Sequence, residues 1–546
     1  MFKVKYMGKE KVFNQKVSLL SLLDEKDKYN YLAAKVNNRL RELTYEVYYD
    51  CEVEFLGFDN YNAIKIYETS LRYLIAMTFE ILYPHLEIRF SYNVSRSLFL
   101  QILNGKKTID NELLTQVNNK MKELIERDIP FKRKVVTNQE ALEIYKARGF
   151  EDKIDALAYR PEKTVHFYEC DGYLNYMYGY MVPSTGYLRQ YVLRLLLPGI
   201  IIQYPRSELN GQIGPFEYAS RYGHTLKQAY LWAKLCDAET VAKVNYQCET
   251  NVVDFMNLCE TRHNNMLAEL GELIKKDADT IRLIAIAGPS SSGKTTFAHR
   301  LRIQLMSKGI KPVKISIDDY YLGKEQCPRD ENGEIDLEHI NAIDVNLFNQ
   351  HLLALIQGEE VELPRFDFQL QKRVRGNKIK VDANSPIIIE GIHALNEELT
   401  SLIPKHQKFK IYISPQIQIN LDNHNPISLT DIRLIRRLVR DYKYRNSPAE
   451  NTFSMWDSVR RGEFKWIYPH QEGADYVFNS ELTYELCVLK KYAMPLLRAV
   501  KNESEHYITA NRLIKYLKYF KDIEDDLVPC NSILREFIGG SCFKDV

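Results

Sequence analysis

The chain has 546 residues, which is too long for a single hydrophobic core and predicts about three or four domains. Its 74 Lys and Arg residues nearly balance 72 Asp and Glu residues, so the net charge of +2 does not demand a nucleic-acid partner. The nine cysteines are scattered without a C-x-x-C pair, which argues against a disulfide framework and against a zinc ribbon. The first residues lack the apolar stretch of a signal peptide, and the most apolar run, 192–202, is interrupted by Arg194 and Pro198. We therefore expect a cytoplasmic protein in a reducing compartment, with no membrane partner.

Alternating apolar and polar positions at Phe2, Val4 and Tyr6 predict a first strand. Residues 32–36 predict a helical segment, and residues 53–56 return to a strand pattern. Together these signals indicate a small β-grasp-like domain over residues 1–60. After it, apolar residues recur at helical spacing over 69–83 and Pro84 ends the run, which predicts a helix that faces a core.

The order of a β-grasp module, a helix ending Leu82-Tyr83-Pro84 and the later turn Val182-Pro183-Ser184-Thr185-Gly186 resembles the N-terminal region of threonyl-tRNA synthetases over about residues 1–225. The resemblance implies that residues 61–225 form an α+β domain of the editing type. In that family the editing site is built on an H-x-x-x-H helix pair and on a Cys and a His four residues apart. The matching positions here are Thr69, Tyr73, Met177 and Met181. None is a typical ligand for a hard or borderline metal, so we expect editing chemistry to be absent.

The role of this first half stays open between RNA contact, regulation and pure structure. The basic stretch 132–134 fits a solvated face better than an RNA track, because no long basic run with interleaved aromatic residues surrounds it. Nucleic-acid binding is therefore not favoured, but it is retained as an alternative. The spacing of apolar residues over 226–276 predicts a helical connector to the second half.

A phosphate-binding motif opens the second half. Residues 283–296 read as an apolar strand, a small-residue loop and the start of a helix, and Gly288, Gly293, Lys294 and Thr295 satisfy the G-x-x-x-x-G-K-[ST] spacing. In such a loop the backbone amides and the helix N-terminus face the phosphates, the lysine neutralises charge and the threonine hydroxyl can bind Mg²⁺. A plain Gly/Ser turn before a helix is the weaker reading, because all eight positions are in register. We expect ATP to bind to Gly288, Pro289, Ser290, Ser291, Ser292, Gly293, Lys294, Thr295 and Thr296.

Three further strands are predicted in the second half, at 313–317, 386–389 and 409–413. With the helix predicted over 296–306 they indicate an α/β domain with a doubly wound, mostly parallel sheet over residues 277–500. Asp318 and Glu390 stand at the carboxyl ends of two of these strands, where ligands bind in such sheets. A carboxylate there can bind magnesium or accept a proton from an attacking hydroxyl. The alternative is that Asp318 and Asp319 cap a helix.

A basic helix is predicted over 431–441, on which Arg433, Arg437 and Arg440 share one face. A solvated basic face is the ordinary explanation for such a pattern. A kinase, however, needs arginines that cover the transferred phosphate, and here we favour that function.

Taken together, these blocks resemble the uridine-cytidine kinase branch of the phosphoribulokinase/uridine kinase family over about residues 280–480. The shared blocks, in family order, are the phosphate loop, Ser316-x-Asp318-x-Tyr320-Tyr321, Phe366-Asp367-Phe368, Glu390-Gly391-Ile392 and Arg436-Arg437-x-x-Arg440-Asp441. The resemblance implies that Asp318 is the general base on the nucleoside 5′-hydroxyl and that Lys294 is the phosphate lysine. It also implies magnesium near Thr295, Asp318 and Glu390. Arg437, Arg440 and Arg445 match lid arginines and ribose or phosphate contacts.

Two departures from the family concern the substrate. Phe366 and Gln371 stand where the family has a Tyr and a His that read the pyrimidine edge, and Asn341 stands where it has an Asp near the ribose hydroxyls. Both amides can still hydrogen-bond, so a ribonucleoside remains a plausible substrate while its base is left open. We expect the substrate to contact Tyr321, Asn341, Phe366, Gln371, Arg373, Arg437 and Arg445.

The sequence thus favours an ATP- and Mg²⁺-dependent nucleoside kinase followed by a helical tail over residues 501–546, for which it suggests no role. A kinase of a phosphorylated pentose stays open, because Lys372, Arg373 and Arg375 could hold a second phosphate. A regulatory or RNA-binding ATPase is the alternative from another class. The related kinases commonly self-associate, so a homo-oligomer is also left open.

Overall fold

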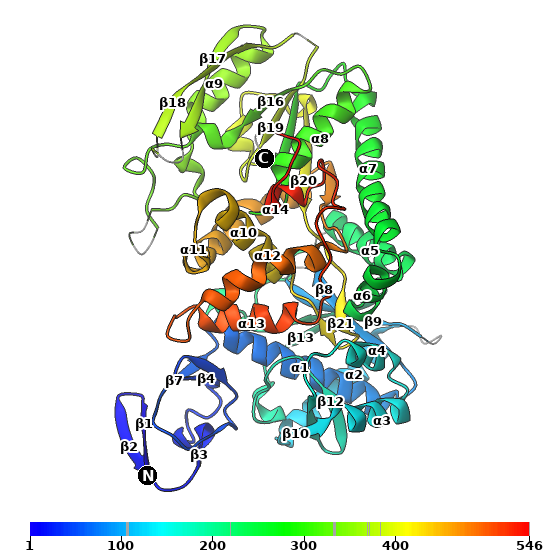
Figure 1. Cartoon of the computed structure of the whole chain (residues 1–546), viewed down its shortest axis with the longest axis vertical. Coiled ribbons are helices and arrows are strands. Elements are labelled where there is room, and N and C mark those ends of the chain that lie inside the picture. The colour runs from blue at the N-terminus through cyan, green and yellow to red at the C-terminus, as the bar shows by residue number, and fades with distance from the viewer. Residues whose placement is uncertain are drawn as a thin grey trace.

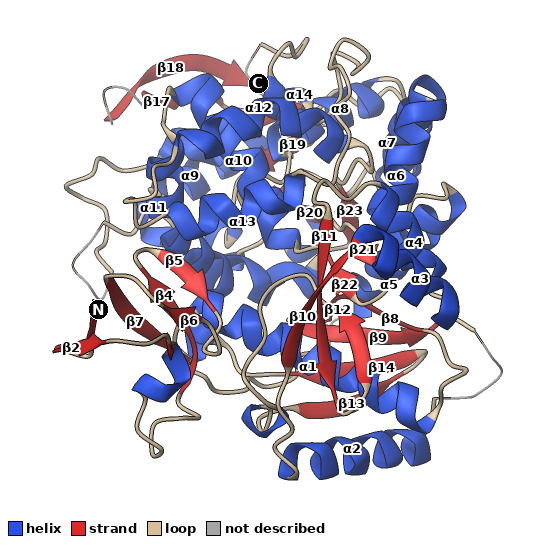
Figure 2. Ribbon diagram, turned by 60° about the horizontal axis from the view of Figure 1, so that its bottom comes forward, coloured by secondary structure: helices blue, strands red, loops and turns tan. Residues whose placement is uncertain are grey.

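The computed structural model describes residues 1–94, 96–104, 109–218, 220–330, 333, 335–367, 370, 372–382 and 384–544. Strands and helices from the first half of the chain lie at the bottom of Figure 1, and the parallel sheet of the second half lies at the top. Figure 2 shows the helices of the second half enclosing that sheet, whereas the strands of the first half gather on the opposite side. No helix in the described part of the chain has the length and apolarity that a membrane crossing requires.

The N-terminal sheet contains five strands in the order β2-β1-β7-β4-β5, with β1 and β7 parallel. These strands are β1 (Phe2–Tyr6), β2 (Lys9–Phe13), β4 (Tyr31–Val36), β5 (Arg39–Arg41) and β7 (Cys51–Gly57). The helical prediction for residues 32–36 was wrong, because this segment is strand β4 and pairs with both β5 and β7. The segment is too short for a stable helix, and the two neighbouring strands satisfy its backbone instead. A separate pair, β3 (Val17–Ser18) and β6 (Glu46–Val47), joins the loops.

A long buried helix organises the next part of the chain. Helix α1 (Tyr61–Leu82) contains the helix that was predicted over 69–83, but it begins earlier, where Asn60 caps its N-terminus. Around it lie the sheets β13-β14-β9-β8 and β10-β11-β12. Thr69, Tyr73, Met177 and Met181, the positions compared with an editing site, are all buried at this centre. The elements are β8 (Ile88–Val94), β9 (Ser97–Ile102), α2 (Asn111–Glu126), β10 (Lys132–Thr137), α3 (Asn138–Arg148), α4 (Glu151–Ala158), β11 (Thr164–Cys170), β12 (Tyr173–Tyr176), β13 (Val192–Leu196) and β14 (Gly199–Gln203).

Three helices occupy the predicted connector and lead to the second half: α5 (Ser220–Leu235), α6 (Val241–Thr250) and α7 (Val252–Lys276). The sheet that follows is parallel throughout, in the order β16-β19-β15-β20-β23. Along β15, Leu283 and Ala285 pack into one core and Ile284 and Ile286 into another, so both faces of the sheet are covered. The strands are β15 (Leu283–Ala287), β16 (Val313–Ser316), β19 (Ile387–Glu390), β20 (Lys408–Ser414) and β23 (Tyr476–Asn479).

The remaining elements surround this sheet. They are α8 (Lys294–Met306), α9 (Val345–Ile356), the hairpin β17 (Glu360–Asp367) and β18 (Lys372–Lys380), α10 (Leu429–Arg445), α11 (Ala449–Gly462), α12 (Glu485–Ala499), α13 (Tyr507–Leu517) and α14 (Arg535–Ile538). The chain ends beside α8 and β20 after crossing the molecule as the red segment of Figure 1. This path returns the tail to the phosphate-binding motif.

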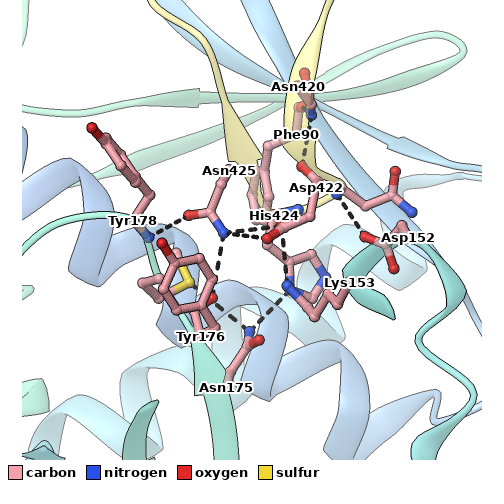
Figure 3. Close-up of polar contacts among 12 residues, drawn as sticks. Phe90, Asp152, Lys153, Asn175, Tyr176, Tyr178, Asn420, Asp422, His424 and Asn425 are labelled. Carbon is pink, nitrogen blue, oxygen red and sulfur yellow. Dashed lines mark hydrogen bonds and ion pairs between the residues drawn. The ribbon is translucent and has the colours of Figure 1, made fainter. Parts of the chain in front are cut away.

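A buried polar junction joins the two halves (Figure 3). A hairpin between β20 and α10, made of β21 (Asn420–Asp422) and β22 (Asn425–Pro426), enters the first half. There Lys153 Nζ lies 3.0 Å from Asp422 Oδ1, and the two side chains are only 2% and 1% exposed. Asn175 donates to His424 Nδ1 at 2.9 Å, and burial, then Lys153, lowers the pKa of His424 to about 3. His424 is therefore a neutral acceptor.

Backbone contacts hold the same hairpin from several sides. Asn420 donates to the Phe90 carbonyl at 2.7 Å, and the backbone N–H of Asn423 donates to Asp152 at 2.8 Å. Helix α10 begins at Leu429, directly after the hairpin. The first half of the chain therefore fixes the start of the arginine-rich helix.

Breaking this junction should destabilise the protein. Lys153→Met leaves the Asp422 carboxylate buried without its cation, so we expect the free energy of unfolding to fall by about 3–5 kcal/mol. Lys35→Met is the control, because Lys35 and Glu54 form an ion pair 2.9 Å apart that is 30% and 61% exposed. Such a surface pair contributes at most about 1 kcal/mol. Denaturant titrations of both variants test this, and equal shifts would contradict it.

Candidate active site

The phosphate loop lies between β15 and α8. Gly288 through Gly293 form the loop, while Lys294, Thr295 and Thr296 make the first turn of α8. Gly293 has a φ of 88° and Ser291 a φ of 60°, both in the left-handed region. A Cβ at Gly288 would lie 2.0 Å from the Ile413 carbonyl oxygen, so only glycine fits there. The predicted strand, loop and helix are confirmed.

The lysine of the motif lies inside this loop. Lys294 Nζ donates to the carbonyl oxygens of Gly288 at 3.0 Å and Pro289 at 3.1 Å. Burial lowers the pKa of Lys294, and the carboxylates of Glu390 and Asp318 oppose that shift. The amino group is thus held where an anion entering the loop would meet it.

Two neighbouring carboxylates after β16 have different surroundings. Asp319 Oδ1 accepts the backbone N–H of Phe366 at 3.1 Å, so this residue attaches β17 to the sheet. Burial raises the pKa of Asp318, while Lys294, then Arg445 and other cations, oppose it. Asp318 therefore belongs to the charged interior of the site. Neither aspartate caps the short helix at 317–320, because Ser316 does so.

Oxygen donors for a metal lie in the first turn of α8 and at the carboxyl end of β19. The Thr295 hydroxyl is 3.5 Å from Glu390 Oε1, at the carboxyl end of β19. Burial, followed by Asp318, raises the pKa of Glu390 to about 7. These oxygen donors suit Mg²⁺, which prefers hard ligands. Within the described ranges no three His, Cys, Asp or Glu side chains form a metal cage, so phosphate and water oxygens would complete its shell.

Helix α10 brings its arginines to this site around one aspartate. Asp441 is fully buried and lies 3.2 Å from Arg437 Nε, 3.1 Å from Arg440 Nη2 and 3.4 Å from Arg445 Nη1. Burial alone would raise the pKa of Asp441, but the three guanidinium groups outweigh it and lower the pKa. Arg437 also donates to Ser290 Oγ at 2.9 Å. Arg433, on the same predicted face, is instead paired with the buried carboxylate of Glu463.

The expected substrate residues are only partly gathered. The rings of Tyr321 and Phe366 meet edge to face, with their centroids 6.0 Å apart. Arg373 is bound to Asp344, with Nη1 2.9 Å from Oδ2. Asn341 is exposed, and Gln371 lies outside the described residues. The exposed position of Asn341 follows from the short helix at 340–342, which directs neighbouring side chains to different sides.

Glu338 is the carboxyl that sequence reasoning missed at this site. Burial raises its pKa to about 7, while Arg437 and then Lys294 lower it and Asp318 raises it, which shows that Glu338 lies among these charged groups. It stands three positions before Asn341. The sequence signal for Glu338 was an acidic residue close to Asn341. A single sequence, however, does not show whether position 338 or position 341 faces the site.

Comparison with known proteins decides the family. The family description "Phosphoribulokinase / Uridine kinase family" matches residues 283–486. A uridine kinase of Halalkalibacterium halodurans is 30% identical over 223 residues, which cover 40% of this chain and 97% of that protein. The chain belongs to the phosphoribulokinase/uridine kinase family. The family supports a kinase, that is, a phosphotransferase with ATP as donor, in the second half of the chain.

Two further similarities cover 36% and 40% of this chain. A uridine kinase of Borrelia duttonii is 33% identical over 199 residues, covering 36% of this chain and 85% of that protein. A solved structure described as a possible uridine kinase from Bacillus stearothermophilus is 18% identical, with a TM-score of 0.28, and covers 40% of this chain and 98% of that one. The family match begins at residue 283, so the synthetase-like reading of the first half stays a prediction.

The titration of Glu338 gives a test of the site. A carboxyl with a pKa near 7 loses its charge as the pH falls below 7, so we expect phosphoryl transfer to decline on the acid side of a profile between pH 5.5 and 8.5. Glu338→Gln removes one of two carboxyls with a pKa near 7, the other being Glu390, so the decline on the acid side should become shallower and turnover at pH 8 should fall. If the activity of Glu338→Gln declines at acid pH just as that of the wild type does, another group is responsible for the decline.

Proposed function

We propose that the protein is an ATP- and Mg²⁺-dependent nucleoside kinase, which phosphorylates the 5′-hydroxyl of uridine, cytidine or a similar ribonucleoside. The observation that carries this proposal is the position of Asp318, a half-buried carboxylate within the charge field of the phosphate-loop lysine and two α10 arginines. The similarity to proteins named uridine kinase gives the acceptor class. Such an activity would serve pyrimidine salvage in the cytoplasm.

In the proposed reaction, Asp318 accepts the proton of the 5′-hydroxyl as its oxygen attacks the γ-phosphorus of ATP and ADP leaves. The raised pKa of Asp318 suits this role, because a carboxylate with a higher pKa is a stronger base. Lys294 and the amides of the first turn of α8 would hold the β- and γ-phosphates. Mg²⁺, held by Thr295 and Glu390 and near Asp318, would neutralise phosphate charge when bound.

The α10 arginines would stabilise the charge that develops on the transferred group. Arg440 and Arg445 have partly exposed side chains, 19% and 52%, and both lie against the fixed anion Asp441. Asp441 therefore orients guanidinium groups that can still reach a ligand. Arg437 is less mobile, because it is bound to both Asp441 and Ser290.

On the acceptor side, Tyr321 and Phe366 offer an aromatic surface for a base, and Glu338 offers a carboxylate for ribose hydroxyls. A phosphorylated pentose fits the site less well as a substrate. Arg373 is already paired with Asp344, and Arg375 is 94% exposed beside Glu362. These contacts favour an uncharged acceptor.

The two aspartates after β16 provide a matched pair of variants. Asp318→Asn should lower kcat with uridine by at least ~10²-fold while leaving the affinity for MgATP nearly unchanged, because it removes the general base but keeps Thr295 and Glu390 for the magnesium. In Asp319→Asn the amide oxygen can still accept the Phe366 N–H, so we expect near-normal turnover. ADP release and calorimetric MgATP titration measure both quantities. Equal activity of Asp318→Asn and the wild type would remove Asp318 from this role.

A further inference from the structure

The C-terminal tail returns to the phosphate loop, although the sequence suggested no role for it. Its residues Ser532, Ile533, Leu534, Phe537 and Ile538 are buried. Helix α14 packs on α10, and the Arg436 guanidinium lies 5.0 Å from the centre of the Phe537 ring. The C-terminal segment is therefore packed into the protein between α10 and α8.

The tail touches the phosphate loop at two points. A Cβ at Gly293 would lie 2.4 Å from Ile533 Cγ2, so the tail packs directly on the last glycine of the motif. Glu536 Oε2 accepts the backbone N–H of Thr296 at 3.0 Å. Thr296 stands in the first turn of α8, where backbone amides lack partners within the helix.

The carboxylate of Glu536 thus occupies a place made for a phosphate oxygen. A helix N-terminus attracts any anion, and here the anion belongs to the protein itself. Glu536 also lies close enough to Lys294 and Glu390 to act on both: it opposes the lowering of the Lys294 pKa and adds to the raised pKa of Glu390. A nucleotide phosphate entering the loop would meet this negative charge and would compete with it for the Thr296 amide.

We propose that the C-terminal tail is an autoinhibitory segment in which Glu536 competes with the nucleotide phosphates for the N-terminus of α8. Binding of ATP requires Glu536 to leave the Thr296 amide, so the tail sets the apparent affinity for nucleotide. The inference rests on the proposed function only in taking ATP as the ligand of this loop.

The charge of Glu536 can be removed with little change in shape. Glu536→Gln should bind MgADP and a non-hydrolysable ATP analogue about tenfold more tightly than the wild type in calorimetric titrations, because the competing anion is gone. Glu524→Gln is the control, since Glu524 lies in the same tail, is 74% exposed and pairs with Lys491. Unchanged or weaker binding by Glu536→Gln would overturn the proposal.

Hydrogen exchange of the unmodified protein gives a second test that does not depend on folding of a variant. The analogue should increase amide exchange over residues 532–538, and no increase would overturn the proposal. Assays of uridine phosphorylation separate the two claims. If Glu536→Gln binds nucleotide more tightly but neither protein phosphorylates any nucleoside, the proposed function is refuted and the role of the tail stands. If nucleosides are phosphorylated normally but Glu536→Gln binds nucleotide no more tightly than the wild type, the role of the tail is refuted and the proposed function stands.

A separate observation concerns the ends of this segment. Cys530 and Cys542 are exposed, whereas the other cysteines are buried. The backbone N–H of Cys542 donates to the Cys530 carbonyl at 2.9 Å, and the Cys530 thiol lies near enough to raise the pKa of the Cys542 thiol. Backbones this close are compatible with the Cα separation of a disulfide.

We infer that Cys530 and Cys542 form a reversible disulfide that closes the loop carrying Glu536. With hydrogen peroxide, one sulfur is oxidised to a sulfenic acid with release of water, and the other thiol then displaces a second water as the S–S bond forms. The two sulfurs lose two electrons, the peroxide gains them, and the thiol protons end in the two waters. Closing this loop should restrain Glu536 on the Thr296 amide.

Peroxide treatment of the wild type should remove two hydrogens from the intact mass and weaken binding of MgADP several-fold, and dithiothreitol should restore both. Cys542→Ser, treated in the same way, should keep its original affinity. Absence of an intramolecular disulfide, or a disulfide that leaves affinity unchanged, would overturn the inference.

Discussion

The attachment of α10 to the phosphate loop is the constraint on which the rest of the site depends. Arg433 Nε donates to the Ser290 carbonyl at 3.1 Å, Arg436 Nη1 approaches the Ser291 carbonyl at 3.4 Å, and Arg437 donates to the Ser290 hydroxyl. Each of the three cations is paired with a buried carboxylate, from Glu463, Glu485 and Asp441. A buried arginine without such a partner would be costly, so loop and helix are fixed as one unit.

This unit explains why the two halves of the chain are joined as they are. The hairpin that precedes α10 is held inside the first half by the Lys153–Asp422 pair and by the bond from Asn175 to His424. A displacement of the first half would therefore act on the start of the arginine helix. At its other side α10 carries the tail, which reaches the Thr296 amide. Helix α10 thus connects the first half of the chain, the phosphate loop and the C-terminus.

The features that the sequence predicted well are local ones. The phosphate loop, the strand before Asp318 and the strand before Glu390 each depend on a few consecutive residues and their spacing, and the parallel sheet follows from their order. The error at 32–36 arose because pairing with distant strands decides the structure of so short a segment. Asn341 was expected to contact the substrate, yet Asn341 is exposed and the half-buried Glu338 is the member of that block that lies among the charged groups, since the side that a residue faces in a short turn has no periodic signal. The Glu536 contact joins residues 240 positions apart, and no pattern in the sequence announces it.

The central claim is that this site transfers phosphate from ATP to a nucleoside hydroxyl. The most direct test is ADP release by the purified 546-residue protein with MgATP against uridine, cytidine, other ribonucleosides, deoxyribonucleosides and pentose phosphates, with the product mass measured. The account predicts strong stimulation by a pyrimidine ribonucleoside and a product heavier by one phosphoryl group. Stimulation by a pentose phosphate alone, or by none of these compounds, would contradict it.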